Sequence, residues 1–330
     1  MNSQMNSSPF PTVSIVIPSL CGESEHLKRL TTSALNSGIP EKRLEIVTAV
    51  GISPNGRARD VGVTRAHGDY LIFMDDDVSF PEPEDLKKLV SYVDSHPEVG
   101  LVGPAQQLPD NLSEKDRRRA LQLPRSHVEV PDEFRETDMV THACLVISRE
   151  LFLDVGMEHP NLISGTDPDL RNRVRERGLK VGIVPKTRVY HPPIMGLNNL
   201  IDKNFKKGRW SRWVREHYPN YHLSTEPDVT SVPEARQNSL ADRINRNLEW
   251  LRKEILNGHG WAITARLSYV TGYCFETLLS KNWVKTIPYP DPPSPEHPEW
   301  SQFLDTLEEQ GEVKVLHRGD MMKSNNRESV

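Results

Sequence analysis

The chain has 330 residues, of which 36% are hydrophobic and 7% aromatic, with 41 Lys and Arg against 46 Asp and Glu. This length allows one large α/β domain or two smaller domains, and a formal charge of −5 without an acidic or basic tail excludes a histone-like or polybasic nucleic-acid binder. Three widely spaced cysteines offer no disulfide framework, which favours a reducing compartment.

The first third of the chain alternates apolar runs with segments of helical periodicity, which is the pattern of a parallel sheet with crossover helices. Three continuous apolar runs predict strands buried on both faces, over 13–17, 44–50 and 70–74. Apolar residues at helical spacing predict helices over 27–35, 57–66 and 83–96. Residues 1–11 are polar and lack the apolar core of a signal peptide, so a disordered N-terminus is expected.

The middle of the chain is less regular. Strands are predicted over 99–102, 140–148, 181–184 and 188–190, with a helix over 167–177. The polar stretch 104–131 predicts a loop that contains a short helix.

From about residue 197 the periodicity is helical. One apolar stripe is formed by Ile244, Leu248, Leu251 and Ile255, and a second helix is predicted over 261–279. Because Arg266 and Glu276 interrupt the second helix, no segment is expected to span a membrane.

Three consecutive carboxylates, Asp75, Asp76 and Asp77, follow the strand predicted over 70–74. Adjacent carboxylates repel one another, which favours a cationic partner. In an extended chain Asp75 and Asp77 share a face, and carboxylate oxygens suit Mg²⁺ or Mn²⁺. Ligands also bind beyond the carboxyl ends of strands in open α/β sheets. On the residues alone, a metal site and a solvated acidic loop remain equally open.

The order of motifs resembles that of a family 2 glycosyltransferase with the GT-A fold. The matching segments are VSIVIPSL (13–20), RARDVGVTRAHGDYLIFMDDDV (57–78), GTDPDLRNRVRERGLKVGIVP (165–185) and VYH (189–191). Within the second segment the family positions are filled by Ala58, Arg59, Gly62, Ala66, Gly68, Asp75 and Asp77. Asp60 stands where the family has asparagine. The resemblance covers roughly residues 12–218. It is specific because all of these motifs occur in the family's order, whereas no single motif would be specific by itself.

This resemblance implies an α/β, GT-A-like (Rossmann-like) fold with a mostly parallel sheet flanked by helices and a helical C-terminal region. A glycosyltransferase domain is expected over 12–218, with a nucleotide-binding half at about 12–103 and an acceptor half at about 104–218. A helical extension over 219–318 and a flexible tail over 319–330 are expected to follow.

The resemblance also implies a donor and metal site. Asp75 and Asp77 would hold Mn²⁺ or Mg²⁺ with His191, for which a surface or packing role is the alternative. The donor would contact Pro18, Ser19, Leu20, Arg59 and Asp76, although a turn role is equally open for Asp76. Val50 and Gly51 stand where the family has two aspartates, the first of which commonly contacts the base, so the identity of the nucleotide base stays open.

Asp167 is the candidate catalytic base by the same resemblance. The residues alone predict that Asp167 is a helix N-cap with Pro168 at the first helical position. The two roles are compatible, because a capping carboxylate is held rigidly. Asp169, Leu170 and Arg173 match the family spacing after Asp167, whereas Thr166 replaces a family glutamate.

A basic stretch runs from Arg171 to Glu216, with five Lys and eight Arg against three acidic residues, a local balance of +10. The alternate arginines at 171, 173, 175 and 177 cannot all share one helical face, so part of this charge is expected to be solvated surface. The cations of 203–215 could close over a diphosphate, and packing on the domain is the favoured role for Phe205, Trp210 and Trp213.

Together these features predict a metal-dependent glycosyltransferase of the hexosyltransferase type, which moves a sugar from a nucleotide-diphospho-sugar donor to an acceptor hydroxyl with inversion. The acceptor would be a carbohydrate or a lipid-linked molecule, as in surface polysaccharide or glycolipid synthesis, and no nucleic acid is expected as a partner. The chain is expected in the cytoplasm, with peripheral contact to the inner face of the membrane.

Two alternatives remain open. One is an enzyme like the sugar-nucleotide pyrophosphorylases, which is disfavoured because residues 18–22 do not form a glycine-rich loop. The other is a non-catalytic carbohydrate-binding protein of the same fold.

Overall fold

The computed structural model describes residues 10–218, 240–279, 286–290, 293–310 and 312–317. Within them the strands are β1 (Val13–Ser19), β2 (Leu44–Val50), β3 (Tyr70–Met74), β4 (Val99–Gln107), β5 (Arg135–Glu136), β6 (Cys144–Ser148), β7 (Lys180–Tyr190) and β8 (Glu312–His317). The helices are α1 (Glu25–Leu35), α2 (Asn55–Thr64), α3 (Asp85–Ser95), α4 (Glu114–Ala120), α5 (Arg149–Asp154), α6 (Thr166–Glu176), α7 (Leu197–His217), α8 (Leu240–Leu256), α9 (Gly260–Leu279) and α10 (Trp300–Glu308), with a 3₁₀ turn at Glu41–Arg43.

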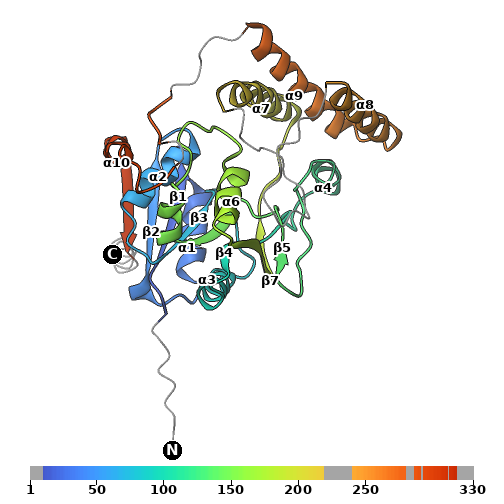
Figure 1. Ribbon diagram of the computed structural model, residues 1–330. Coiled ribbons are helices and arrows are strands. Elements are labelled where there is room, and N and C mark those ends of the chain that lie inside the picture. The colour runs from blue at the N-terminus through green and yellow to red at the C-terminus, as the bar shows by residue number, and fades with distance from the viewer. Residues whose placement is uncertain (1–9, 219–239, 280–285, 291–292, 311, 318–330) are drawn as a thin grey trace, which may run out of the picture.

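The strands form one sheet in the order β5-β7-β4-β6-β3-β1-β2-β8 (Figure 1). Strands β1, β2, β3, β4 and β7 run in one direction, while β5, β6 and β8 run against them. The sheet is therefore mixed: five of the eight described strands share one direction, in keeping with the predicted mostly parallel sheet, and three run against them. The carboxyl ends of the five co-directional strands meet at one edge.

Each face of the sheet carries its own hydrophobic cluster. Ile15 and Ile17 of β1 pack with α1 and α3, whereas Val16 points to the opposite face and packs with α2, α5, α6 and α10. Successive strand residues alternate between faces, so a strand buried on both sides is apolar throughout. Gly62, one of the two glycines of α2, lies so close to Val16 that a Cβ there would be 2.6 Å from the valine Cγ1.

The C-terminal region rejoins the sheet. Helix α10 packs against α2, with Phe303 in the same cluster as Val61. Strand β8 then pairs antiparallel with β2, so the segment predicted as a helical extension over 219–318 also contains a strand. The pairing of β8 could not be predicted from its six residues, because its partner β2 lies far away in the chain.

Helices α7 and α9 pack side by side outside the sheet layers, and α8 lies next to α9 (Figure 1). Gly208 of α7 and Gly272 of α9 allow these two helices to cross closely. A Cβ on Gly208 would lie 1.9 Å from the backbone carbonyl oxygen of Tyr269, and one on Gly272 would lie 2.0 Å from that of Phe205. The indole of Trp210 donates to the Ser164 carbonyl at 2.7 Å and connects α7 to the core. In the part of the chain that the structure describes, no helix has the length and apolar character to cross a membrane.

Most element predictions differ only at the ends. The strands predicted over 44–50 and 70–74 are confirmed in full, and that predicted over 13–17 continues to Ser19. The two strands predicted over 181–184 and 188–190 are one strand, β7, and the strand predicted over 140–148 begins only at Cys144. The predicted tail and residues 1–9 lie outside the described residues, as does the side chain of Ile244.

Candidate active site

The candidate site lies at the edge where the five co-directional strands end. The acidic loop Asp75–Asp77 follows β3, and His191 follows β7. Ser79 and Tyr190 exchange two backbone hydrogen bonds of 2.9 and 2.8 Å, which brings the acidic loop beside His191. Strand β6 runs the opposite way, so His142, two residues before it, enters at the same edge.

Each carboxylate of the acidic loop has a different partner. Asp75 accepts a hydrogen bond from the Arg59 guanidinium at 2.9 Å. Asp76 accepts one from the Ser19 hydroxyl at 2.7 Å. The Asp77 Oδ1 lies 3.6 Å from the His191 Nε2. The mutual repulsion of the three carboxylates is therefore relieved by three separate contacts, to α2, β1 and the end of β7.

The predicted metal ligands are only partly brought together. Asp77 and His191 are both partly exposed and adjacent, whereas the Asp75 carboxylate is turned towards Arg59. Among the residues that the structure describes, no three His, Cys, Asp or Glu side chains converge as a metal-binding group. An oxygen and a nitrogen ligand suit Mn²⁺ or Mg²⁺ when water and phosphate oxygens supply the remaining ligands, so this pair fits such an ion.

The predicted donor residues line the turn after β1. Pro18 and Ser19 are buried, while Leu20 is 77% exposed at the mouth of the site. The hydrogen bond from Ser19 ties this turn to Asp76. The structure therefore brings these residues together with Arg59 at one end of the sheet.

Asp167 is the second residue of α6 and not its N-cap, which corrects the sequence prediction. The N-cap is Gly165, whose φ of 86° lies in the left-handed region that glycine adopts readily. The Asp167 Oδ1 instead accepts hydrogen bonds from the His142 backbone N–H at 3.0 Å and from the His142 ring Nδ1. A quarter of the Asp167 side chain, 26%, stays exposed.

His142 joins Asp167 to a second carboxylate. Its ring Nε2 hydrogen-bonds the Glu158 Oε1, and both side chains are almost fully buried. Burial and the Arg59 charge would lower the pKa of His142, but Glu158 and Asp167 outweigh them and raise it. Burial would raise the pKa of Asp167 and of Glu158, yet the His142 charge and hydrogen bonds lower both, and hold the pKa of Asp167 well below its usual range.

Asp60 is a third buried carboxyl in this region. Its Oδ1 accepts the Glu158 backbone N–H at 2.9 Å. Burial, followed by the charge of Glu158, raises the pKa of Asp60 well above its ordinary value. This shift favours the protonated form, which has nearly the shape of asparagine, the residue that the resemblance expects at this position.

Of the four alternate arginines, Arg177 is exposed, as predicted for part of this charge, whereas the other three are largely buried in ion pairs. Arg171 and Arg175 are buried and contact Asp138 at 3.3 and 2.5 Å. Arg173 pairs with Asp169 at 2.6 Å. The predicted packing of Trp210 and Trp213 is confirmed, because both are buried and stack at 4.8 Å.

The sequence did not identify His142 or Glu158. Neither stands in a recognisable motif, and each is one polar residue in a mainly apolar neighbourhood. The one available signal was the replacement of asparagine by Asp60, because a buried carboxyl requires compensating partners.

Comparison with known proteins gives similarities of three kinds. Residues 54–156 match the family model described as glycosyl transferase family 2. The O-antigen biosynthesis protein RfbC of Myxococcus xanthus is 28% identical over 144 residues, which are 38% of this chain and 11% of that protein. The amylovoran biosynthesis glycosyltransferase AmsE of Erwinia amylovora is 28% identical over 163 residues, 49% of this chain and 58% of that protein. The matches thus span less than two thirds of either relative.

Among solved structures, the mannosyltransferase PcManGT from Pyrobaculum calidifontis, in complex with GDP-Man and Mn²⁺, superposes with a TM-score of 0.52 at 11% identity. The similarity covers 83% of this chain and 89% of that one. It confirms the predicted α/β, GT-A-like fold.

Proposed function

We propose that this chain, which belongs to glycosyltransferase family 2 and has the GT-A fold, transfers a sugar from a nucleotide-diphospho-sugar donor to an acceptor hydroxyl. One observation carries the proposal: the acidic loop 75–77 and the candidate base Asp167 both lie at the edge where the co-directional strands end. Ligands bind at this edge in open α/β sheets.

The acidic loop and the turn after β1 form the proposed donor subsite. Asp77 and His191 would hold Mn²⁺ or Mg²⁺, and Asp75 would act through Arg59 or join the ion when the donor is bound. When present, the ion would neutralise charge on the leaving diphosphate. Ser19 and Asp76 lie beside it as a linked pair for the sugar or ribose.

Asp167 is proposed as the general base. Its carboxylate takes the proton of the acceptor hydroxyl while the acceptor oxygen bonds to the anomeric carbon. The bond between that carbon and the diphosphate oxygen breaks, and its electron pair leaves with the nucleoside diphosphate. Attack from the face opposite the leaving group inverts the anomeric configuration.

The acceptor is proposed to be a growing surface polysaccharide or glycolipid. The two curated relatives carry names of O-antigen and amylovoran biosynthesis, which supports a glycan acceptor. The cytoplasm is the proposed location, where nucleotide sugars would be the donors.

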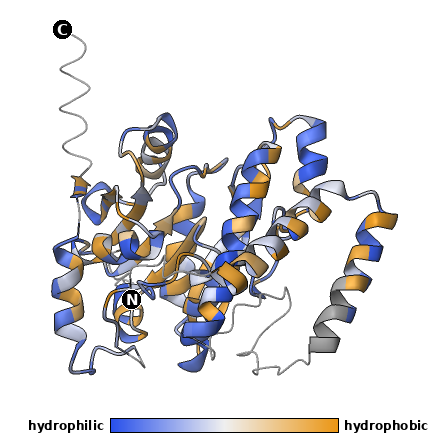
Figure 2. Cartoon of the chain, turned by 90° about the horizontal axis from the view of Figure 1, so that it is seen from above, coloured by the Kyte–Doolittle hydropathy of each residue, from blue (hydrophilic) through white to orange (hydrophobic). Residues whose placement is uncertain are grey.

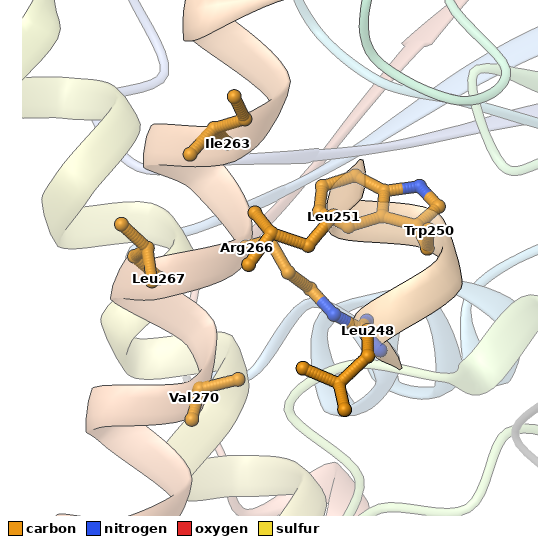
Figure 3. A pocket seen from close by; sticks show the side chains of 7 residues that line it. All are labelled: Leu248, Trp250, Leu251, Ile263, Arg266, Leu267 and Val270. Atoms are coloured by element: carbon orange, nitrogen blue, oxygen red, sulfur yellow. The ribbon is translucent and has the colours of Figure 1, made fainter. Parts of the chain in front are cut away.

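Exposed apolar side chains on α8 and α9 support peripheral contact with a membrane. Leu256 and Leu278 are 76% and 79% exposed, and both helices show apolar stretches in Figure 2. A groove of about 270 Å³ separates these helices and is lined by Leu248, Trp250, Leu251, Ile263, Arg266, Leu267 and Val270 (Figure 3). An exposed apolar surface of this kind, bordered by basic side chains, suits an interfacial position on anionic lipid.

The test is incubation with a panel of nucleotide sugars, with Mn²⁺ or with a chelator, and identification of the products. A glycosyltransferase releases nucleoside diphosphate only in the presence of the ion, and more rapidly with an acceptor. Formation of nucleoside triphosphate from donor and pyrophosphate would identify a pyrophosphorylase. Donor binding without any turnover would identify a non-catalytic binding protein.

A further inference from the structure

The buried histidine between Asp167 and Glu158 has a geometry that determines its protonation. Both ring nitrogens of His142 face carboxylate oxygens, Nδ1 towards Asp167 and Nε2 towards Glu158. A neutral imidazole has one donor and one acceptor nitrogen, and only the imidazolium donates from both. With both carboxylates ionised, His142 therefore carries a proton on each nitrogen.

Glu158 has no evident purpose apart from this contact. Its side chain is fully buried, and its Oε2 has no hydrogen-bond partner among the residues described. A buried carboxylate with an unsatisfied oxygen is destabilising, so its presence requires a compensating gain. Here the gain is a negative charge that keeps His142 cationic without leaving the buried cluster with excess positive charge.

We infer that His142 is a positioning residue for glycosyl transfer: it holds the Asp167 carboxylate by Oδ1 and leaves Oδ2 to receive the proton of the acceptor hydroxyl. This role rests on the proposed function. His142 itself touches no substrate, since only 3% of its side chain is exposed. Its backbone N–H also donates to Oδ1, so two donors from one residue fix the orientation of the carboxylate.

Other charged groups lie close enough to affect the pKa values of His142, Asp167 and Glu158. Arg59 of α2 opposes the charge of His142, and Arg171 and Arg125 add positive charge near Asp167. Arg59 and Arg173 act on Glu158, and Asp60 adds a further carboxyl beside it. With His142 replaced by a neutral side chain, Arg171, Arg125 and Lys207 of α7 remain near Asp167, but its directly bonded cation is gone.

The first experiment reads the protonation state without any assay of activity. The wild-type protein and the His142→Gln variant are labelled with ¹⁵N-histidine, and the signal that the variant lacks is assigned to His142. We expect both ring nitrogens to be protonated at pH 7, and the Glu158→Gln variant to lose this doubly protonated signal at lower pH than wild type. A singly protonated ring in the wild-type protein at pH 7 would overturn the inference.

The second experiment tests the coupling to transfer. His142→Gln should lower kcat by roughly 100-fold, the effect of a misplaced reacting group, with little change in donor KM. Its activity should fall more steeply than that of wild type between pH 8 and pH 5, because Asp167 without its cationic partner protonates more readily. Any loss through the metal ligand His191 is common to both proteins, so the ratio of the two kcat values isolates the effect at Asp167.

Two variants keep the test decisive. The double variant His142→Gln, Glu158→Gln replaces the buried ion pair by two amides that can hydrogen-bond each other, so it should fold even where the single variant does not, and its kcat should remain low. His159→Gln removes another buried histidine, one that packs on Tyr218 and Tyr289, and should leave the pH profile unchanged.

A double variant with wild-type kcat and pH profile would overturn the positioning role. If the wild-type protein instead transfers no sugar from any donor, while the NMR signal shows a doubly protonated His142, the proposed function is wrong and the positioning role falls with it.

Discussion

At the scale of single residues, the site is a set of carboxylates distinguished by their partners. Asp77 beside His191 is partly exposed and can accept a cation, whereas Asp75 is paired with Arg59. His142 lowers the pKa of Asp167, whereas burial raises the pKa of Asp60. Carboxyl groups of one chemical kind thus acquire different roles from their surroundings.

The metal assignment is tested most cleanly at Asp77. Asp77→Ala should abolish the Mn²⁺-dependent part of nucleotide diphosphate affinity and leave the thermal transition nearly unchanged, because the side chain is 44% exposed. Isothermal titration calorimetry with and without Mn²⁺ measures this. Asp75→Ala is a poorer probe, since it would leave the buried Arg59 guanidinium without its ion pair. Equal Mn²⁺-dependent affinity in Asp77→Ala and wild type would contradict the assignment.

The base assignment is tested by Asp167→Asn. The amide oxygen can still accept the two His142 hydrogen bonds, but the group cannot take a proton at neutral pH, so kcat should fall by roughly 10²–10⁴-fold. Nucleoside diphosphate release measured at saturating donor gives kcat. Thermal unfolding is the control for folding, and transfer at near the wild-type rate would show that Asp167 has only a structural role.

Asp60→Asn should stabilise the protein. A carboxyl with a raised pKa in the folded state favours folding below its unfolded pKa, and this contribution is lost as pH rises towards the folded value. Asparagine has no such pH dependence, so the gain in unfolding free energy should be roughly 1–3 kcal/mol at pH 7 and should shrink towards pH 4. Urea unfolding at the two pH values measures the difference. A variant less stable than wild type at pH 7 would show that Asp60 is ionised in the fold.

At the scale of elements, strand β6 and helix α6 place residues of the candidate site at one edge of the sheet. Strand β6 runs against its neighbours β3 and β4, so that its beginning, and not its end, lies at the functional edge. Helix α6 begins at the same edge, with Asp167 in its first turn. The candidate base and its histidine partner therefore both lie where an element begins at this edge.

The close crossing of α7 and α9 gives a prediction at this scale. Gly208→Ala would place a Cβ 1.9 Å from the Tyr269 oxygen, so the helices must separate. The expected loss of stability is roughly 1–3 kcal/mol, despite the better helix propensity of alanine. Gly260→Ala is the matched control, since a Cβ there meets nothing within 4 Å. Chemical unfolding of both variants compares them, and equal stability would show that the crossing tolerates a methyl group.

At the scale of the whole molecule, the catalytic edge and the apolar helices belong to separate surfaces. The sheet with α1, α2, α3, α6 and α10 carries the site (Figure 1), while many of the exposed large apolar side chains lie on α8 and α9. The N-terminus of α9 contacts the loop after α4, because the Trp261 backbone N–H donates to the Gln122 Oε1 at 2.9 Å. A membrane bound by these helices would thus lie next to this loop.

Liposome flotation tests this arrangement. Wild-type protein should float with anionic vesicles at low salt and less so at high salt, because each suitably placed basic residue contributes about 1 kcal/mol. Leu278→Glu should reduce flotation, whereas Leu20→Glu, at a similarly exposed leucine away from α8 and α9, should not. Wild-type protein that remains wholly in the soluble fraction would exclude the membrane surface as the docking partner.

The sequence by itself determined the features that depend on neighbouring residues. Strands 44–50 and 70–74, the acidic loop after β3 and the position of Asp167 in the first turn of a helix all follow from local pattern. The resemblance over 12–218 supplied the GT-A fold and most of the residues at the functional edge. These features can be predicted because hydrophobic periodicity, capping residues and short motifs each involve only a few neighbouring residues.

The tertiary structure decided what depends on distant contacts. The reversal of β6, the return of β8 to β2, and the pairing of Asp75 with Arg59 could not be deduced from the pattern. His142 meets Asp167 and Glu158 across 25 and 16 residues, and Asp60 meets Glu158 across 98. The protonation of these groups depends on burial and on the charges that folding gathers around them, and neither exists until the chain has folded.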